Sequence, residues 1–135
     1  MKTKHWEIAW VEDMPSIIQP HTFYISMQHR LTEHLCACGC GTEVSLPLGP
    51  SEWRIEGEEA GISLHPSVGN WRLPCKSHYV IHNSTTHWRE TWTAQQISAG
   101  RARDQNAKNR EIAANRRLMP WWLRIWYWFC RLVRR

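Results

Sequence analysis

Three cysteines stand at alternate positions in the stretch HLCACGCGTE. They are Cys36, Cys38 and Cys40, and two more residues that bind metals, Cys75 and His78, follow in the stretch PCKSH. Zinc takes four thiolate or imidazole ligands in a tetrahedron, commonly as two pairs from two loops. The spacing therefore predicts a zinc site built from four of these five residues.

Five candidate ligands compete for four positions, so one of the three clustered thiols is expected to be surplus. The favoured sets combine Cys36 with Cys38, or Cys38 with Cys40, and add Cys75 and His78; the spacing leaves the choice open. The chain starts with MKTKHWEIAWVEDMP, which lacks the apolar segment of a secretory signal. We therefore expect a cytoplasmic protein, in which clustered cysteines are metal ligands rather than disulfides. An iron–sulfur cluster is the weaker alternative, because it prefers four cysteines.

Four protein ligands make a zinc site structural, whereas a catalytic zinc keeps an open position and a nearby base. Catalysis would need His65 or His82, together with Glu33 or Glu43, beside the metal. The sequence contains neither an HExxH motif nor the zinc-deaminase signature. Ser77 lies between two predicted ligands, and no base or oxyanion hole is evident for a nucleophilic serine. We therefore expect a structural zinc.

Short strands must position these ligands. Alternating apolar residues or clustered strand formers mark six segments before residue 93. The expected strands are 6–10, 21–31, 42–48, 61–68, 77–83 and 86–92. The stretch EGEEAG is predicted to be a solvated acidic loop. The prolines before residue 93 disfavour long helices in this region. We predict a mainly β fold, in which residues 1–93 form a small antiparallel zinc-stabilised β domain.

The end of the chain is strongly basic. From Arg101 onward ten basic residues face two acidic ones, whereas seven basic residues face ten acidic ones before it. Residues 94–119 lack proline and are rich in helix formers, so a basic helix is predicted that ends at Pro120. Residues 120–135 are predicted to form a short amphipathic helix, which is too short and too charged to span a bilayer.

The predicted tail helix has a cationic side and an aromatic side, which is typical of helices that lie at a membrane surface. The side chains expected to make contacts are Trp121, Trp122, Arg124, Trp126, Phe129, Arg131, Arg134 and Arg135. Their partner could be the inner membrane surface, another anionic partner, the protein's own β domain or a second copy of the chain. The sequence leaves these alternatives and the oligomeric state open.

Five motifs follow one another in the order C-x-C-G-C-G, Trp, S-L-x-P-S, C-x-S-H and a late Trp. They correspond to Cys36–Gly41, Trp53, Ser63–Ser67, Cys75–His78 and Trp88. Over about residues 30–110 the chain thereby resembles a bacterial and phage family defined as a domain of unknown function. The family is encoded in phages and in bacterial gene clusters beside ubiquitin-like proteins and their activating and conjugating enzymes. The resemblance implies a role in such a pathway or in phage biology.

These observations together predict a non-enzymatic, zinc-stabilised binding module of bacterial or phage origin. We expect it to be accessory to a ubiquitin-like conjugation system, with a ubiquitin-like or other protein as its partner. One alternative is a small zinc-dependent hydrolase, such as a peptidase that acts on a ubiquitin-like protein. A further alternative is an accessory protein that binds nucleic acid through its arginine-rich end.

Overall fold

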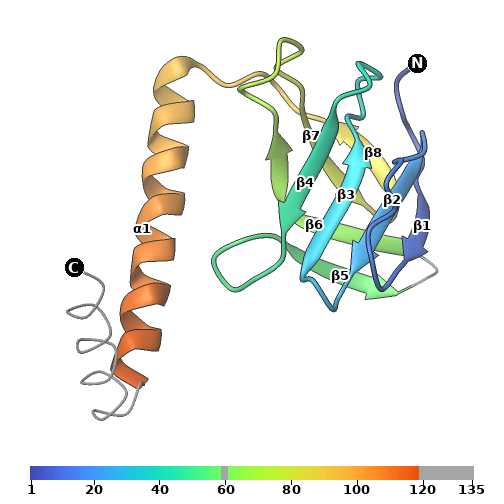
Figure 1. Cartoon of the computed structure of the whole chain (residues 1–135). Coiled ribbons are helices and arrows are strands. Elements are labelled where there is room, and N and C mark those ends of the chain that lie inside the picture. Colours follow the sequence, from blue (N-terminus) through green and yellow to red (C-terminus); the bar gives the residue numbers. More distant parts are fainter. Residues whose placement is uncertain (59–60, 119–135) are drawn as a thin grey trace, which may run out of the picture. The chain divides into compact units, whose positions relative to one another are not determined.

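The structure is a computed structural model that describes residues 1–58 and 61–118. This part of the chain contains eight strands and one long helix (Figure 1). The elements are β1 (Glu7–Trp10), β2 (Thr22–Ser26), β3 (Leu31–Leu35), β4 (Glu43–Pro47), β5 (Arg54–Glu58), β6 (Gly61–Gly69), β7 (His78–His82), β8 (Thr85–Trp88) and α1 (Ala94–Leu118). The prediction of a mainly β fold followed by a helix is confirmed.

The strands form two four-stranded sheets, β1-β2-β3-β4 and β5-β6-β7-β8, each in chain order. All neighbouring pairs are antiparallel except β1 and β2, which run parallel. The sheets are thus mostly antiparallel, as the sequence predicted, and this pair is the exception. The connection over residues 11–21 explains it, because it is long enough to return the chain in the same direction, and Pro15 and Pro20 interrupt any helix there.

Two local predictions differ from the structure. The single strand expected over 21–31 is divided into β2 and β3 by a turn at 27–30, where Arg30 has a φ of 51°. The acidic stretch expected to be a loop begins inside β5, which extends to Glu58. Because β5 lies at the edge of its sheet and its side chains are mostly exposed, charged residues are tolerated there without alternating apolar ones.

The two sheets bury one common core. Many of its members come from alternate positions on β2, β4, β6 and β7: Phe23, Ile25, Val44, Leu46, Ile62, Leu64, Tyr79 and Ile81. The segment before β1 ties the second sheet to this core, since the buried indole N–H of Trp6 donates a 2.8 Å hydrogen bond to the hydroxyl of Thr86 on β8. Loops from both sheets are therefore held in a defined relation to each other.

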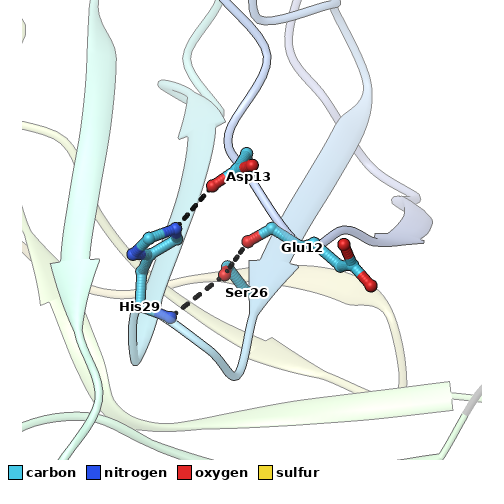
Figure 2. A network of polar contacts seen from close by, with 4 residues as sticks. All are labelled: Glu12, Asp13, Ser26 and His29. Atoms are coloured by element: carbon cyan, nitrogen blue, oxygen red, sulfur yellow. Dashed lines mark hydrogen bonds and ion pairs between the residues drawn. The ribbon is translucent and has the colours of Figure 1, made fainter.

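A polar network fixes the long connection after β1 to the turn after β2 (Figure 2). The hydroxyl of Ser26 donates to the backbone carbonyl of Glu12 and accepts the backbone N–H of His29. The imidazole of His29 lies 2.7 Å from the carboxylate of Asp13. These contacts give partners to the backbone groups of Glu12 and His29 just beyond the end of the parallel pair.

Helix α1 starts with a capping box. The hydroxyl of Thr93 accepts the backbone N–H of Gln96, while the Gln96 side chain accepts the backbone N–H of Thr93. Met1–Ser98 forms one compact unit, and the chain from Ala99 belongs to a second. Among the described residues, no helix is long and apolar enough to cross a membrane.

The predicted tail helix, 120–135, with all of its expected contact residues, lies outside the described residues. The domain limits 1–93, 94–119 and 120–135 therefore stay predictions.

Candidate active site and metal centre

Four cysteines come together where two loops from different sheets meet. The loop between β3 and β4 supplies Cys36, Cys38 and Cys40, and the loop between β6 and β7 supplies Cys75. All four sulfur atoms lie within 4.8 Å of one another. None of the four forms a disulfide, and their burial falls from Cys36, which is buried, to Cys40, which is exposed.

Three of the separations between the sulfur atoms are close to those that a single metal ion requires. Zinc–sulfur bonds of about 2.3 Å in a tetrahedron place neighbouring sulfur atoms about 3.8 Å apart. Cys75 lies 3.9 Å from both Cys36 and Cys40, and Cys36 lies 3.4 Å from Cys38. The hydroxyl groups of Ser77 and Thr42 and the side-chain amide of Asn70 contact sulfur atoms of this group, as expected beside metal ligands. The group can therefore hold one metal ion with four thiolates.

The ionisation of these thiols differs along the cluster. Burial raises the pKa of Cys36, and burial followed by contacts with neighbouring thiols raises that of Cys38 to about 12. The Thr42 hydroxyl and backbone lower the pKa of Cys40 to about 6. Metal ligation needs thiolates, so a cation would have to favour the ionised form of the buried thiols.

His78 lies outside this group, although its spacing from Cys75 suggested a ligand pair. Its Nε2 atom is 3.0 Å from the hydroxyl of Ser67, and its Nδ1 atom is 2.7 Å from the backbone carbonyl of Glu90. The group contains four of the five candidate ligands. All three of the clustered thiols, Cys36, Cys38 and Cys40, belong to it, so none of them is set apart as the surplus one. Whether they bind a metal stays a prediction.

The bonding of the His78 ring defines its neutral tautomer. A carbonyl oxygen can only accept, so Nδ1 carries the proton and donates to Glu90. Nε2 then has a free lone pair and accepts the hydrogen bond from the hydroxyl of Ser67. This is the arrangement of a nucleophile and its general base, with a backbone carbonyl as the group that orients the base.

The register of β6 and β7 brings Ser67 and His78 together. His78 is the first residue of β7 and pairs with Gly69, so Ser67 is its diagonal neighbour on the same face. Ser67 lies inside a bulge, because four residues separate Leu64 from Val68 on β6 where only two separate their partners Ile81 and Tyr79 on β7. Bulges re-aim side chains and are common beside active sites. Here the hydroxyl of Ser67, within the bulge, lies 3.0 Å from the imidazole.

Two indoles pack around the imidazole of His78. The ring centroid of Trp71 lies 4.9 Å and that of Trp92 5.3 Å from the imidazole, and the two indoles stack on each other at 5.6 Å. Gly69 is required beneath them, since a Cβ atom there would collide with the Trp71 ring. His78 itself is only 6% exposed, so its ring is held in a restricted, partly apolar site.

Other serine–histidine neighbours lack this arrangement. Ser63 lies 3.1 Å from Nδ1 of His82, but His82 is exposed and, in the described part of the chain, no hydrogen bond holds its other ring nitrogen. Ser26 and His29 lie close to a carboxylate, yet the serine accepts the backbone N–H of the histidine rather than facing its ring (Figure 2). Ser67 and His78 alone, among the described residues, have the geometry of an oriented base on a hydroxyl.

The residues proposed for a catalytic zinc are dispersed. The imidazole of His65 lies 3.7 Å from Glu56, and His82 contacts Ser63. The carboxylate of Glu33 accepts a hydrogen bond from Ser45, and Glu43 is exposed at the start of β4. None of these side chains belongs to the group of four cysteines.

Sequence reasoning missed the pairing of Ser67 with His78. Each residue is the last of a motif that carries the family resemblance: Ser67 ends S-L-x-P-S, and His78 ends C-x-S-H. These two motifs were the signal available. The second motif was interpreted as a pair of metal ligands, so its histidine was assigned to the zinc. The serine considered as a nucleophile was Ser77, whose hydroxyl lies 3.1 Å from the sulfur of Cys36 instead.

The fold and these side chains define a small β protein that has a serine–histidine pair next to a four-cysteine cluster. A family model described as "Bacterial ubiquitination-like system serine protease (BubE)" matches residues 10–89. This match covers more than half of the chain, and the chain therefore belongs to that family. No curated protein and no solved structure matches the chain.

The matched range contains Ser67, His78 and the four clustered cysteines. The resemblance to a bacterial family associated with ubiquitin-like systems is thus confirmed, and this setting indicates protein partners. A phage origin and a cytoplasmic location stay predictions, as do membrane and nucleic-acid partners.

Proposed function

We propose that the protein is a serine protease in which Ser67 is the nucleophile and His78 the general base. The observation that carries this proposal is the 3.0 Å contact between the Ser67 hydroxyl and Nε2 of His78, whose Nδ1 is held by the Glu90 carbonyl. The family's description as a serine protease supports it. The proposal replaces the non-enzymatic binding module that the sequence favoured.

The chemistry would follow the serine protease scheme. The Ser67 oxygen attacks the carbonyl carbon of the substrate, and its proton moves to Nε2 of His78. The imidazolium donates this proton to the departing amine as the carbon–nitrogen bond breaks, which leaves an acyl ester on Ser67. Water then attacks the ester and gives a proton to Nε2; this proton returns to the Ser67 oxygen as the carboxylic acid leaves.

The substrate we propose is a peptide or isopeptide bond at a ubiquitin-like protein of the same system. The support for this class is the family's membership of a ubiquitination-like system. The protein would then trim or remove a ubiquitin-like protein. This is the substrate class of the zinc-dependent hydrolase considered from the sequence, but the chemistry is assigned to a serine rather than to a metal.

We propose zinc as the ion of the cysteine cluster, with a structural role. Cys36, Cys38, Cys40 and Cys75 would hold it, and when bound it would cross-link the two loops. Four thiolates complete a tetrahedron, so no open position is left for a substrate or water. The reaction is therefore assigned to Ser67 and His78 and not to the metal.

A covalent probe tests the nucleophile. The full chain is incubated with a fluorophosphonate, which forms an oxygen–phosphorus bond with an activated serine as fluoride leaves, and the adduct is located by mass spectrometry. We expect one adduct, on Ser67, and a loss of about 10³-fold or more in labelling rate for S67A and H78Q. The matched control is S63A, which removes the hydroxyl beside His82 and should label at the wild-type rate. Equal labelling of S67A and wild type would contradict the proposal.

The metal ligands are tested by metal content. Purified wild-type chain should carry about one zinc ion, as four thiolates predict. C38S and C75S should bind zinc at least about tenfold more weakly, because each removes one thiolate. H78Q should keep wild-type zinc content, since His78 bonds to Ser67 and Glu90. Loss of zinc in H78Q would instead restore histidine as a ligand.

A further inference from the structure

The cysteine cluster and the serine–histidine pair share one short piece of chain. Cys75 belongs to the cluster and precedes His78 by three residues, and Ser67 lies on β6 just before the same loop. The loop therefore carries a thiol of the cluster and leads directly into His78. The contacts inside the loop decide how rigid that connection is.

Asn70 donates three hydrogen bonds that tie this loop together. Its side-chain amide donates to the hydroxyl of Ser77 at 2.9 Å and to the sulfur of Cys36 at 3.4 Å. Its backbone N–H donates to the carbonyl of Ser77 at 2.9 Å. The first residue after β6 thus holds the peptide that immediately precedes His78 and, at the same time, a thiol of the cluster.

Ser77 completes the connection from the other side. It is 6% exposed, and its hydroxyl lies 3.1 Å from the sulfur of Cys36 and 3.6 Å from that of Cys75. The residue before it, Lys76, has a φ of 44°, a conformation that non-glycine residues adopt only when their surroundings hold them. The Ser77 peptide, and with it the start of β7, therefore depends on the contacts to Asn70 and the thiols.

We propose that Asn70 is a positioning residue that couples metal binding at the cluster to the alignment of His78 on Ser67. This inference rests on the proposed function. Hydrogen bonds to a metal-bound thiolate are stronger than those to a neutral thiol, because the acceptor carries charge. Asn70 donates to the sulfur of Cys36, and the Ser77 hydroxyl would have to donate to it once that sulfur is a thiolate; both residues fix the backbone next to His78.

Thr42 provides a matched comparison. Its hydroxyl also contacts a cluster thiol, lying 3.4 Å from the sulfur of Cys40. It belongs to the loop between β3 and β4, whereas Asn70, Cys75 and Ser77 belong to the loop between β6 and β7 that precedes His78. T42A therefore perturbs a thiol contact without touching the connection through Asn70.

The test uses the full chain as wild type, N70A, S77A and T42A, each under reducing conditions with zinc and after zinc removal by a chelator. The first readout is the NMR signal of the His78 imidazole, which reports its hydrogen bonding without any reaction. The second is the rate of Ser67 labelling by a fluorophosphonate. Zinc content and circular dichroism establish that each variant is folded and loaded.

Removing zinc from the wild type and from T42A should shift the His78 signal and slow labelling by about tenfold, within the usual range for coupled sites. In zinc-loaded N70A the His78 signal should already resemble the zinc-free wild type, and zinc removal should change labelling by less than about twofold. S77A, which keeps the backbone bond to Asn70, should fall between the two.

An unchanged His78 signal on zinc removal from the folded wild type would overturn the inference, as would a zinc response of N70A equal to that of T42A. Absence of Ser67 labelling in every sample would refute the proposed function alone, because the NMR signal would still test the coupling.

Discussion

The proton on the His78 ring is placed by a backbone atom. The carbonyl of Glu90 accepts it at 2.7 Å, so the tautomer that serves Ser67 is selected without a carboxylate. The carbonyl comes from the segment after β8, where the backbone N–H of Arg89 bonds to the carbonyl of His78. This backbone pairing, rather than a third side chain, orients the base.

A substitution of Glu90 distinguishes orientation of His78 by the backbone carbonyl of Glu90 from orientation by its side-chain carboxylate. If the backbone carbonyl orients His78, then E90A keeps the contact and should label at Ser67 within about threefold of the wild type. H78Q, which removes the base itself, should lose about 10³-fold or more. Both rates come from the same fluorophosphonate assay. A loss in E90A comparable to that in H78Q would show that the carboxylate takes part.

At the scale of elements, the cysteine loop depends on backbone conformations that favour glycine. Gly39 and Gly41 have φ values of 84° and 76°, and both lie between β3 and β4. Their surroundings differ. A Cβ atom on Gly39 would collide with the backbone of Met1, whereas one on Gly41 would meet nothing within 4 Å. The loop therefore has one glycine that is needed for its φ and one that is also needed for space.

Alanine at each position should distinguish these requirements. G41A should lower the free energy of unfolding by about 1 kcal/mol, the usual cost of a left-handed φ. G39A should cost clearly more, because the Met1 backbone must also move. Chemical denaturation of the zinc-loaded chains gives both values. Equal losses would mean that the segment at Met1 yields freely to the added methyl group.

The sequence could predict those elements and sites whose signals are local in the chain. Alternation of Val44 and Leu46 with polar neighbours marks β4, and clustered thiols mark a metal site, because both signals are local in the chain. The contact of Ser67 with His78 depends on a strand register that is shifted by a bulge, which no local pattern reveals. The two motifs that contain Ser67 and His78 could be recognised in the sequence. The contacts that make His78 a general base rather than a metal ligand could not.

At the scale of the whole molecule, the cluster connects the two sheets. Three of its cysteines follow β3 in the first sheet, and Cys75 precedes β7 in the second. Metal binding to residues from two sheets would add to the free energy of folding of the β unit. The serine–histidine pair and the carbonyl that orients it all lie within the same compact unit, Met1–Ser98.

A truncated chain tests whether this unit is sufficient. Residues 1–98 contain Ser67, His78, Glu90 and every residue of the cysteine cluster, so they should bind about one zinc ion and label at Ser67 within about twofold of the full chain. The basic residues from Arg101 onward should instead matter for binding an anionic partner, which is measured separately with the same two chains. Thermal unfolding followed by circular dichroism shows whether the shorter chain folds cooperatively. If it folds and binds zinc but fails to label, the basic region contributes to the active site, and the assignment of catalysis to the β unit alone is wrong.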